Sequence, residues 1–339
     1  MTCDRPIFLV GCPRSGTTLL SALLHAHPRI AMPPETRFLI PAYEKRAQFG
    51  DLEIAENRRR LARWITRPGW TKFDDLRLDR DAVVDKIVAG PPTFGSAMGI
   101  VWREFATSRG KARWGEKRPA YWRYLGTIRR LFPDAQIVHL IRDGRACVAS
   151  LDQVPWWPTG RLGAMTTWAL ADRELRRAGR TLPADTYHAV RYEDVLADPR
   201  GTLTALCGFL GEDFDERMLE HAEAARDVVP TFKAWHARAD HELDLARVEA
   251  WRQTLTAADI GLLEATLGRR LRTNGYALTG AGTRPSPGAL LGYARAYAHH
   301  RASIHKWDAQ DALRRRRDRN PLAARLTSAE IAAADAASA

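Results

Sequence analysis

The stretch "VGCPRSGTTLL", residues 10–20, gives the clearest indication of the fold. Gly11 and Gly16 stand at the spacing of a phosphate-binding loop, and Thr17 and Thr18 follow them. The loop of a kinase or nucleoside triphosphatase has a lysine at the position of Thr17. The stretch is therefore a phosphate-loop pattern without the lysine that reaches a terminal phosphate.

The flanks of this loop predict a strand before it and a helix after it. Residues 6–11 form a continuous apolar run that ends in glycine, and residues 16–26 have leucines along one face before Pro28. In a strand–loop–helix, unpaired backbone N–H groups and the helix dipole favour an anion at the helix N-terminus. The candidate anion-binding residues of the loop are Arg14, Ser15, Gly16, Thr17 and Thr18.

Further strands and helices alternate along the chain. Residues 113–117 resemble a short strand that enters a loop, and apolar runs within residues 135–141 and 185–196 predict further strands. Helices are predicted at 120–132, 143–151, 199–211 and 256–271. This alternation is typical of an α/β protein. We expect a P-loop-type central parallel sheet flanked by helices on both faces, with helical insertions and a helical C-terminal extension.

The composition is that of an ordinary globular protein with a basic surface. Of the 339 residues 45% are hydrophobic, and the formal net charge is +12, which favours an anionic ligand such as a nucleotide. The four cysteines show no CxxC spacing, so we expect neither a disulfide framework nor a metal site. The sequence shows no long apolar run and no signal-peptide pattern, which predicts a cytoplasmic protein, and its Arg and Ala content favours a bacterial source.

A second candidate motif is "HLIRDGRACVAS", residues 139–150. A buried strand places Arg142 at its end, and Ser150 follows two helical turns later. Such a pair is commonly a surface ion pair and a helix hydroxyl. Beside a nucleotide loop, however, the pair would bind a second phosphate, which indicates a nucleotide with a distant additional phosphate.

Residues 11–20 together with residues 141–151 resemble the two signature motifs of sulfotransferases that use 3′-phosphoadenosine-5′-phosphosulfate (PAPS). The resemblance implies that the first loop holds the 5′-phosphosulfate and that Arg142 and Ser150 hold the 3′-phosphate. It also implies that 3′-phosphoadenosine-5′-phosphate (PAP) is the product. An activated donor of this kind explains why no metal is expected.

Two further segments are similar to tyrosylprotein sulfotransferases: the Glu-Thr-Arg triplet that begins at Glu35, and "EKRP" at residues 116–119. The similarity implies that Glu35 is the general base and that Lys117, with Arg14, stabilises developing charge. The alternatives are a helix-capping or paired Glu35 and a solvated Lys117. A histidine base, His25 or His27, is a further alternative, although a capping role suits both better.

Residues 190–211 resemble a segment of bacterial sulfotransferases, which implies that Tyr192 lies near the adenine; a tyrosine buried in the core is the alternative. The family usually has a basic residue before the tryptophan of a late loop, but Ala250 precedes Trp251 here. Arg247 or Arg252 would substitute, so we include Arg247 and Trp251 among the expected donor-binding residues.

The sequence therefore predicts a PAPS-dependent sulfotransferase acting on the hydroxyl or phenol of a small molecule or peptide. The alternatives are an ATP-dependent P-loop phosphotransferase and a non-catalytic, nucleotide-binding sulfotransferase-like protein. We expect the sulfotransferase domain to span residues 1–280, with a mostly helical acceptor-side region at 36–110. Residues 281–339 are expected to form a basic helical extension with a frayed tail that contributes to a homo-oligomer contact rather than binding nucleic acid or membrane.

Overall fold

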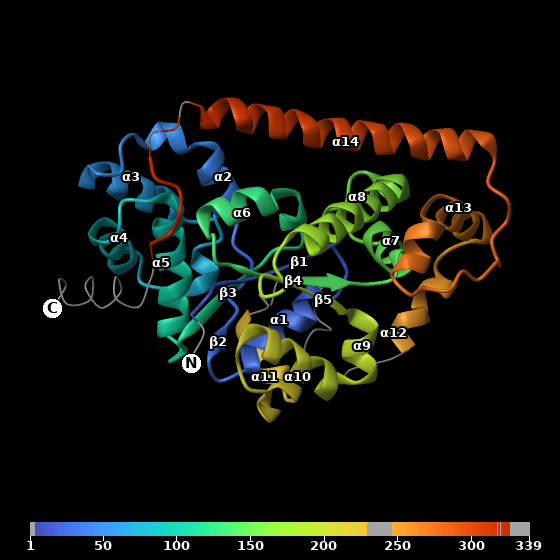
Figure 1. Cartoon of the computed structure of the whole chain (residues 1–339), viewed down its shortest axis with the longest axis horizontal. Helices are drawn as coiled ribbons and strands as arrows, with labels where there is room; N and C mark the ends of the chain where they lie inside the picture. Colours follow the sequence, from blue (N-terminus) through green and yellow to red (C-terminus); the bar gives the residue numbers. More distant parts are fainter. Residues whose placement is uncertain (1–3, 229–245, 317, 319, 326–339) are drawn as a thin grey trace.

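The computed structural model describes residues 4–228, 246–316, 318 and 320–325, and its centre is a parallel β-sheet (Figure 1). The strand order is β2-β3-β1-β4-β5, and every neighbouring pair is parallel. The strands are β1 (Ile7–Gly11), β2 (Ile30–Ala31), β3 (Arg113–Lys117), β4 (Gln136–Ile141) and β5 (Tyr187–Arg191). The predicted α/β class with a central parallel sheet is confirmed.

Helices surround the sheet. They are α1 (Thr17–Ala26), α2 (Leu39–Glu44), η1 (Arg46–Phe49), α3 (Ala55–Ile65), η2 (Asp74–Leu76), α4 (Arg80–Ala89), α5 (Phe94–Thr107), η3 (Pro119–Tyr124), α6 (Leu125–Leu131), α7 (Gly144–Asp152), α8 (Gly160–Thr181), α9 (Tyr192–Ala197), α10 (Pro199–Leu210), η4 (Glu216–Leu219), α11 (Ala222–Val228), α12 (Ala246–Glu249), η6 (Ala250–Gln253), α13 (Ala257–Thr273) and α14 (Pro287–Arg315). The helix expected at 120–132 was predicted too long, because residues 119–124 form a 3₁₀ helix that starts at a proline.

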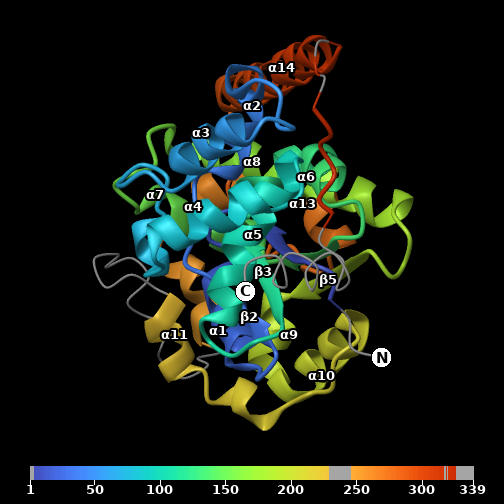
Figure 2. The same cartoon turned by 90° about the vertical axis from the view of Figure 1, so that its left-hand side faces the viewer.

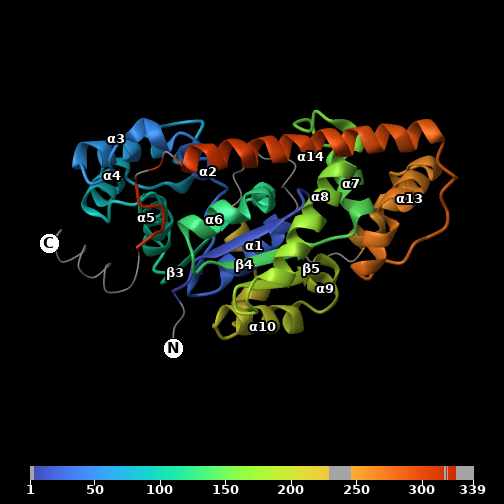
Figure 3. The same ribbon diagram turned by 45° about the horizontal axis from the view of Figure 1, so that its top comes forward.

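The two faces of the sheet pack against different helices because side chains alternate along each strand. Phe8 and Val10 of β1 belong to a core shared with α5, α6, α7 and α8, whereas Ile7 and Leu9 belong to a core shared with α1, α9 and α10. Figures 1 and 3 show these two sets of helices on opposite sides of the sheet.

The helix α14 is 29 residues long and runs across the molecule (Figures 1 and 3). It packs on α8 and α13, and it is fixed near its end by Asp311, which is 2% exposed. Asp311 lies 3.4 Å from Arg46 and 2.9 Å from Arg130, both of which come from the first half of the chain. None of the described helices is both long and apolar enough to cross a membrane.

A short segment after α14, residues 320–325, returns along α5, and we call it the strap (Figure 2). The backbone N–H of Gly95 donates to the carbonyl of Leu322 at 2.9 Å, and the N–H of Ala324 donates to the carbonyl of Leu131 at 2.6 Å. The strap therefore supplies acceptors to the first turn of α5 and a donor to the end of α6, where helix backbone groups have no partner within the helix.

Candidate functional site

The loop between β1 and α1 has the backbone of an anion-binding loop. Gly16 caps α1 with φ 93°, in the left-handed region, and Arg14 has φ 71°. A Cβ added at Gly16 would overlap the ring of Tyr192, so this position requires glycine both for its φ and for its packing. The hydroxyl of Ser15 is buried and has no hydrogen-bond partner among the described residues. The loop thus holds a buried donor that is available to a ligand.

The end of β4 brings Arg142 to this loop. Its Nη1 donates to the carbonyl of Arg14 at 2.9 Å, and Nε of Arg14 donates to the hydroxyl of Ser150 at 2.9 Å. Burial, followed by the positive charge of Arg142, lowers the pKa of Arg14. Two guanidinium groups held together in this way favour an anion beside them, because its charge would offset their repulsion.

Tyr192 completes this cluster from the start of α9. Its ring lies below the guanidinium of Arg142, with the Arg142 Cζ atom 4.5 Å from the ring centroid. The ring also lies close to Gly16, as described above, and it belongs to the buried core on the α1 side of the sheet. Tyr192 is 5% exposed, so it forms the floor under Arg142 and the loop. Its expected place near an adenine stays a prediction.

Glu35 and Lys117 meet on the other side of the loop, at the end of β3. Nζ of Lys117 lies 3.4 Å from Oε2 of Glu35, and Nε of Arg118 lies 3.8 Å from Oε1. The Lys117 side chain is 8% exposed and that of Glu35 is 24% exposed, so the carboxylate faces the outside of this pair. Lys117 is paired rather than solvated. Arg118, the residue after Lys117 in "EKRP", was not predicted as part of the site.

A second carboxyl, Glu116, lies directly behind this pair and was also missed. It is fully buried, and its Oε1 accepts hydrogen bonds from the hydroxyls of Thr36 at 3.0 Å and Tyr121 at 3.3 Å. Burial raises the pKa of Glu116 to about 8. The sequence carried no signal for this environment, since a glutamate followed directly by Lys117 and Arg118 usually indicates a solvated strand end.

The remaining expected residues lie around these two groups. Thr17 and Thr18 begin α1, with Thr17 buried. Trp251 is 2% exposed and packs against Arg145 of α7, whose Cζ atom is 4.4 Å from the indole centroid. Arg247 belongs to α12, but its side chain lies outside the described part of the chain.

The two histidines considered as bases have structural contacts at the opposite end of α1. His25 Nδ1 accepts from the N–H of Met32 at 3.1 Å, and Nε2 lies 3.2 Å from Asp227. His27 Nδ1 accepts from the N–H of Arg29 at 3.1 Å. These contacts support a role for both residues in holding the turn between α1 and β2.

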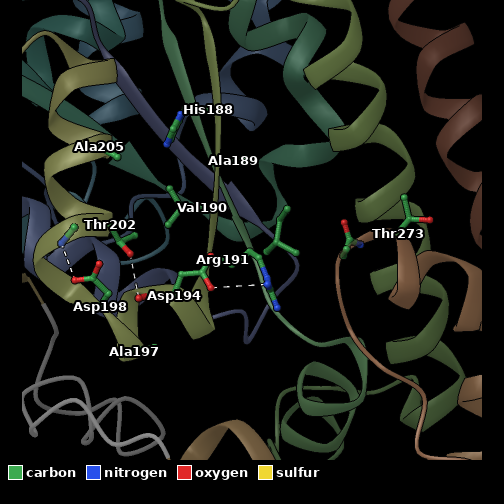
Figure 4. Close-up of a pocket in the computed structure, with 13 residues that line it drawn as sticks. His188, Ala189, Val190, Arg191, Asp194, Ala197, Asp198, Thr202, Ala205 and Thr273 are labelled. Atoms are coloured by element: carbon green, nitrogen blue, oxygen red, sulfur yellow. Dashed lines mark hydrogen bonds and ion pairs between the residues drawn. The ribbon is translucent and has the colours of Figure 1, made fainter.

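An open groove of about 710 Å³ lies along the outer edge of β5, between α10 and the end of α13 (Figure 4). Its lining includes His188, Arg191, Thr202 and Asn274. None of the candidate residues of the loop, of the Arg142 cluster or of the Glu35 pair lines it, so the groove is separate from the candidate site.

The candidate site thus combines two functions at the carboxyl end of the sheet. The loop, Arg14, Arg142 and Ser150 can hold two anionic groups, and Glu35 with Lys117 can accept a proton beside a fixed positive charge. Among the described residues no group of three or more His, Cys, Asp or Glu side chains is placed to share a metal ion. The expectation that no metal takes part stays a prediction.

Comparison with known proteins identifies relatives of this chain. Residues 6–216, more than half of the chain, match the sequence profile of the sulfotransferase family. Protein-tyrosine sulfotransferase 2 of Gallus gallus is 29% identical over 226 residues, which cover 64% of this chain and 54% of that protein. The nodulation protein NoeE of Sinorhizobium fredii is 27% identical over 285 residues, 78% of this chain and 64% of that protein. The chain spans about half the length of the protein-tyrosine sulfotransferases it matches.

Solved structures agree with this at the level of the fold. The sulfotransferase domain of the olefin synthase from Synechococcus PCC 7002 superposes with a TM-score of 0.59 at 27% identity, covering 82% of this chain and 96% of the domain. The sulfotransferase domain of the curacin biosynthetic pathway gives a TM-score of 0.57 at 19% identity, which shows a shared fold.

Proposed function

The chain belongs to the sulfotransferase family, and from this premise we propose that it transfers the sulfuryl group of PAPS to a hydroxyl or phenol acceptor. The observation that carries the proposal is the contact of Arg14 with Ser150 and Arg142 beside a phosphate-type loop. ATP has no phosphate for a second anion site of this kind, whereas PAPS has one at the 3′ position.

The residues present fit this donor. The loop N–H groups and the buried Ser15 hydroxyl would hold the 5′-phosphosulfate, and Arg142 with Ser150 would hold the 3′-phosphate. When bound, PAPS supplies an activated sulfuryl group and a phosphate leaving group. Arg14 within the loop and Lys117 beside it supply fixed positive charge, which would stabilise negative charge that develops there.

Glu35 is the general base in this proposal. Its carboxylate is partly exposed and is held by Lys117 and Arg118, so it can accept the proton of an acceptor hydroxyl that enters beside the loop. Relatives of this chain include protein-tyrosine sulfotransferases, and we therefore propose that the acceptor is a phenol or an alcohol.

Thermal-shift measurements with PAP, with AMP, and with ATP plus Mg²⁺ test the donor. PAP should raise the melting temperature most, because a ligand stabilises the state that it binds. Ser150→Ala should reduce the preference for PAP over AMP, whereas Ser303→Ala, at an exposed serine of α14, should not. An equal or larger shift with ATP plus Mg²⁺ would contradict the proposal and favour a phosphotransferase.

Radiolabelled PAPS tests transfer, with a tyrosine peptide, 2-naphthol and a hexose as separate acceptors. Glu35→Gln should lower kcat about 10²–10⁴-fold, the range for a general base, and leave the PAP-induced thermal shift within error. Turnover that survives this substitution would place the base elsewhere. Binding of PAP without transfer to any acceptor would favour the non-catalytic alternative.

A further inference from the structure

The buried carboxyl of Glu116 is tied to the segment that carries Glu35. Thr36 follows Glu35 directly, it is completely buried, and its hydroxyl donates to Oε1 of Glu116 at 3.0 Å. The hydroxyl of Tyr121 donates to the same oxygen at 3.3 Å. Oε2 of Glu116 is buried and has no hydrogen-bond partner among the described residues. Glu116 is thus an acceptor placed in the core at the edge of the candidate site.

The segments 35–36 and 116–117 contact each other through two successive residues of each. Lys117 reaches Glu35, and Glu116 receives the hydrogen bond of Thr36. Because side chains alternate along a strand, Glu116 lies on the same face of the sheet as its neighbour Phe8, and Lys117 lies on the opposite face with Leu9. The segment 35–36 is therefore fixed on both faces of the end of β3, once by an ion pair and once by a buried hydrogen bond.

The charge state of Glu116 suits this role. Burial raises its pKa to about 8, and the nearby Glu35 carboxylate acts in the same direction. The hydrogen bond from Thr36 and the charges of Lys117 and Arg118 act in the opposite direction. A neutral Glu116 at pH 7 accepts the two hydroxyl groups at Oε1 without competing with Glu35 for Lys117.

We propose that Glu116 is a positioning residue which, through the hydroxyl of Thr36, holds the Glu35 carboxylate against Lys117. The proposal rests on the proposed function, in which Glu35 is the base. In this proposal the buried Glu116 carboxyl fixes the position of the base, and Thr36 connects the two residues. An ion pair at the partly exposed Glu35 alone would leave its position much less defined, since exposed pairs are weak.

A crystal structure of Thr36→Val with PAP bound tests the positioning directly and requires no acceptor. Valine keeps the shape of threonine and removes the donor. The Glu35 carboxylate should then move out of contact with Lys117, whereas Thr36→Ser should restore it. Thr66→Val is the matched control, because Thr66 is equally buried and its hydroxyl donates to the Ala62 carbonyl at 3.0 Å, away from the site. If Glu35 stays on Lys117 in Thr36→Val, the proposal is wrong.

Kinetics then separate this proposal from the proposed function. Thr36→Val should lower kcat roughly 10-fold to 100-fold with little change in the KM for PAPS, and it should cause no further loss in a Glu35→Gln background. An equal loss in both backgrounds would indicate a general structural effect and overturn the proposal. If Glu35→Gln loses turnover but Thr36→Val keeps the kcat of the parent chain, the positioning role alone is wrong. Normal turnover in Glu35→Gln would overturn the assignment of the base.

Discussion

At the scale of single residues, Gly16 is the position where backbone and packing requirements coincide. Its φ of 93° strains any other residue, and an added Cβ would overlap the Tyr192 ring. Gly16→Ala should therefore lower the free energy of unfolding by about 2–5 kcal/mol and abolish the PAP-induced thermal shift. Urea denaturation and the thermal-shift assay measure the two effects.

Gly69→Ala is the matched control for this substitution. Gly69 also has a positive φ, 80°, but an added Cβ would meet no atom within 4 Å. It should cost only about 1 kcal/mol, from the backbone alone, and leave PAP binding unchanged. Equal costs at the two glycines would show that the contact with Tyr192 does not matter.

Glu116 predicts a pH dependence of stability. The folded chain keeps it protonated up to a pKa of about 8, whereas in the unfolded chain it ionises near its ordinary pKa of 4.5. Unfolding between these values releases a proton, so the free energy of unfolding falls as the pH rises and levels off above about pH 8. Relative to Glu116→Gln, the parent chain should lose up to about 1.4 kcal/mol per pH unit in this window. Urea denaturation at a series of pH values measures this difference. If the free energies of unfolding of the parent chain and of Glu116→Gln changed with pH in parallel, the raised pKa would be wrong.

At the scale of elements, α14 is fastened by a buried acid. Asp311 contacts Arg46 and Arg130, and Arg46 is itself 3% exposed. Asp311→Asn should cost about 3–5 kcal/mol in urea denaturation, because it leaves buried positive charge less compensated. Asp85→Asn, which breaks an exposed pair with Arg59, should cost less than about 1 kcal/mol. A small loss at both positions would show that α14 is held by apolar packing alone.

The elements that the sequence predicted well are those with local signals. The apolar run of β1, the glycine before α1 and the side-chain cap of α13 at Thr256 each depend on neighbouring residues. The strand β2 was not predicted, because a pair of residues carries no periodicity. Its place beside β3 is set by segments far apart in the chain.

The candidate site shows the same division. The loop residues and Arg142 follow from strand ends that meet at one edge of a parallel sheet, and their contact was predictable. The burial of Glu116 was not, because it depends on Thr36 and on Tyr121. The role of Asp311 could not be predicted for the same reason. It lies in a basic segment, and its partners Arg46 and Arg130 are far away in the sequence.

At the scale of the whole molecule, the strap connects the end of the described chain to α5 and α6. A Cβ at Gly95 would overlap the Ala324 N–H and the Leu131 carbonyl, which are hydrogen-bonded to each other. Gly95→Ala should displace the strap and speed tryptic cleavage after Arg316, measured by mass spectrometry. Gly126→Ala is the control, because an added Cβ there meets only the Arg130 side chain at 3.5 Å. Trypsin should cleave this variant at the rate of the parent chain. Unchanged cleavage in Gly95→Ala would contradict the close packing of the strap.

The pairing of Arg46 with Asp311 also sets an order of events during synthesis. A ribosome delivers the arginine long before the aspartate, so the nascent chain holds a cation at the edge of a forming core whose counterion has yet to be translated. Burying Arg46 before Asp311 is available would leave a buried charge uncompensated, so we expect this edge of the core to close only after Asp311 has left the exit tunnel. Completion of the fold is in this sense a late event, because it waits for the synthesis of α14.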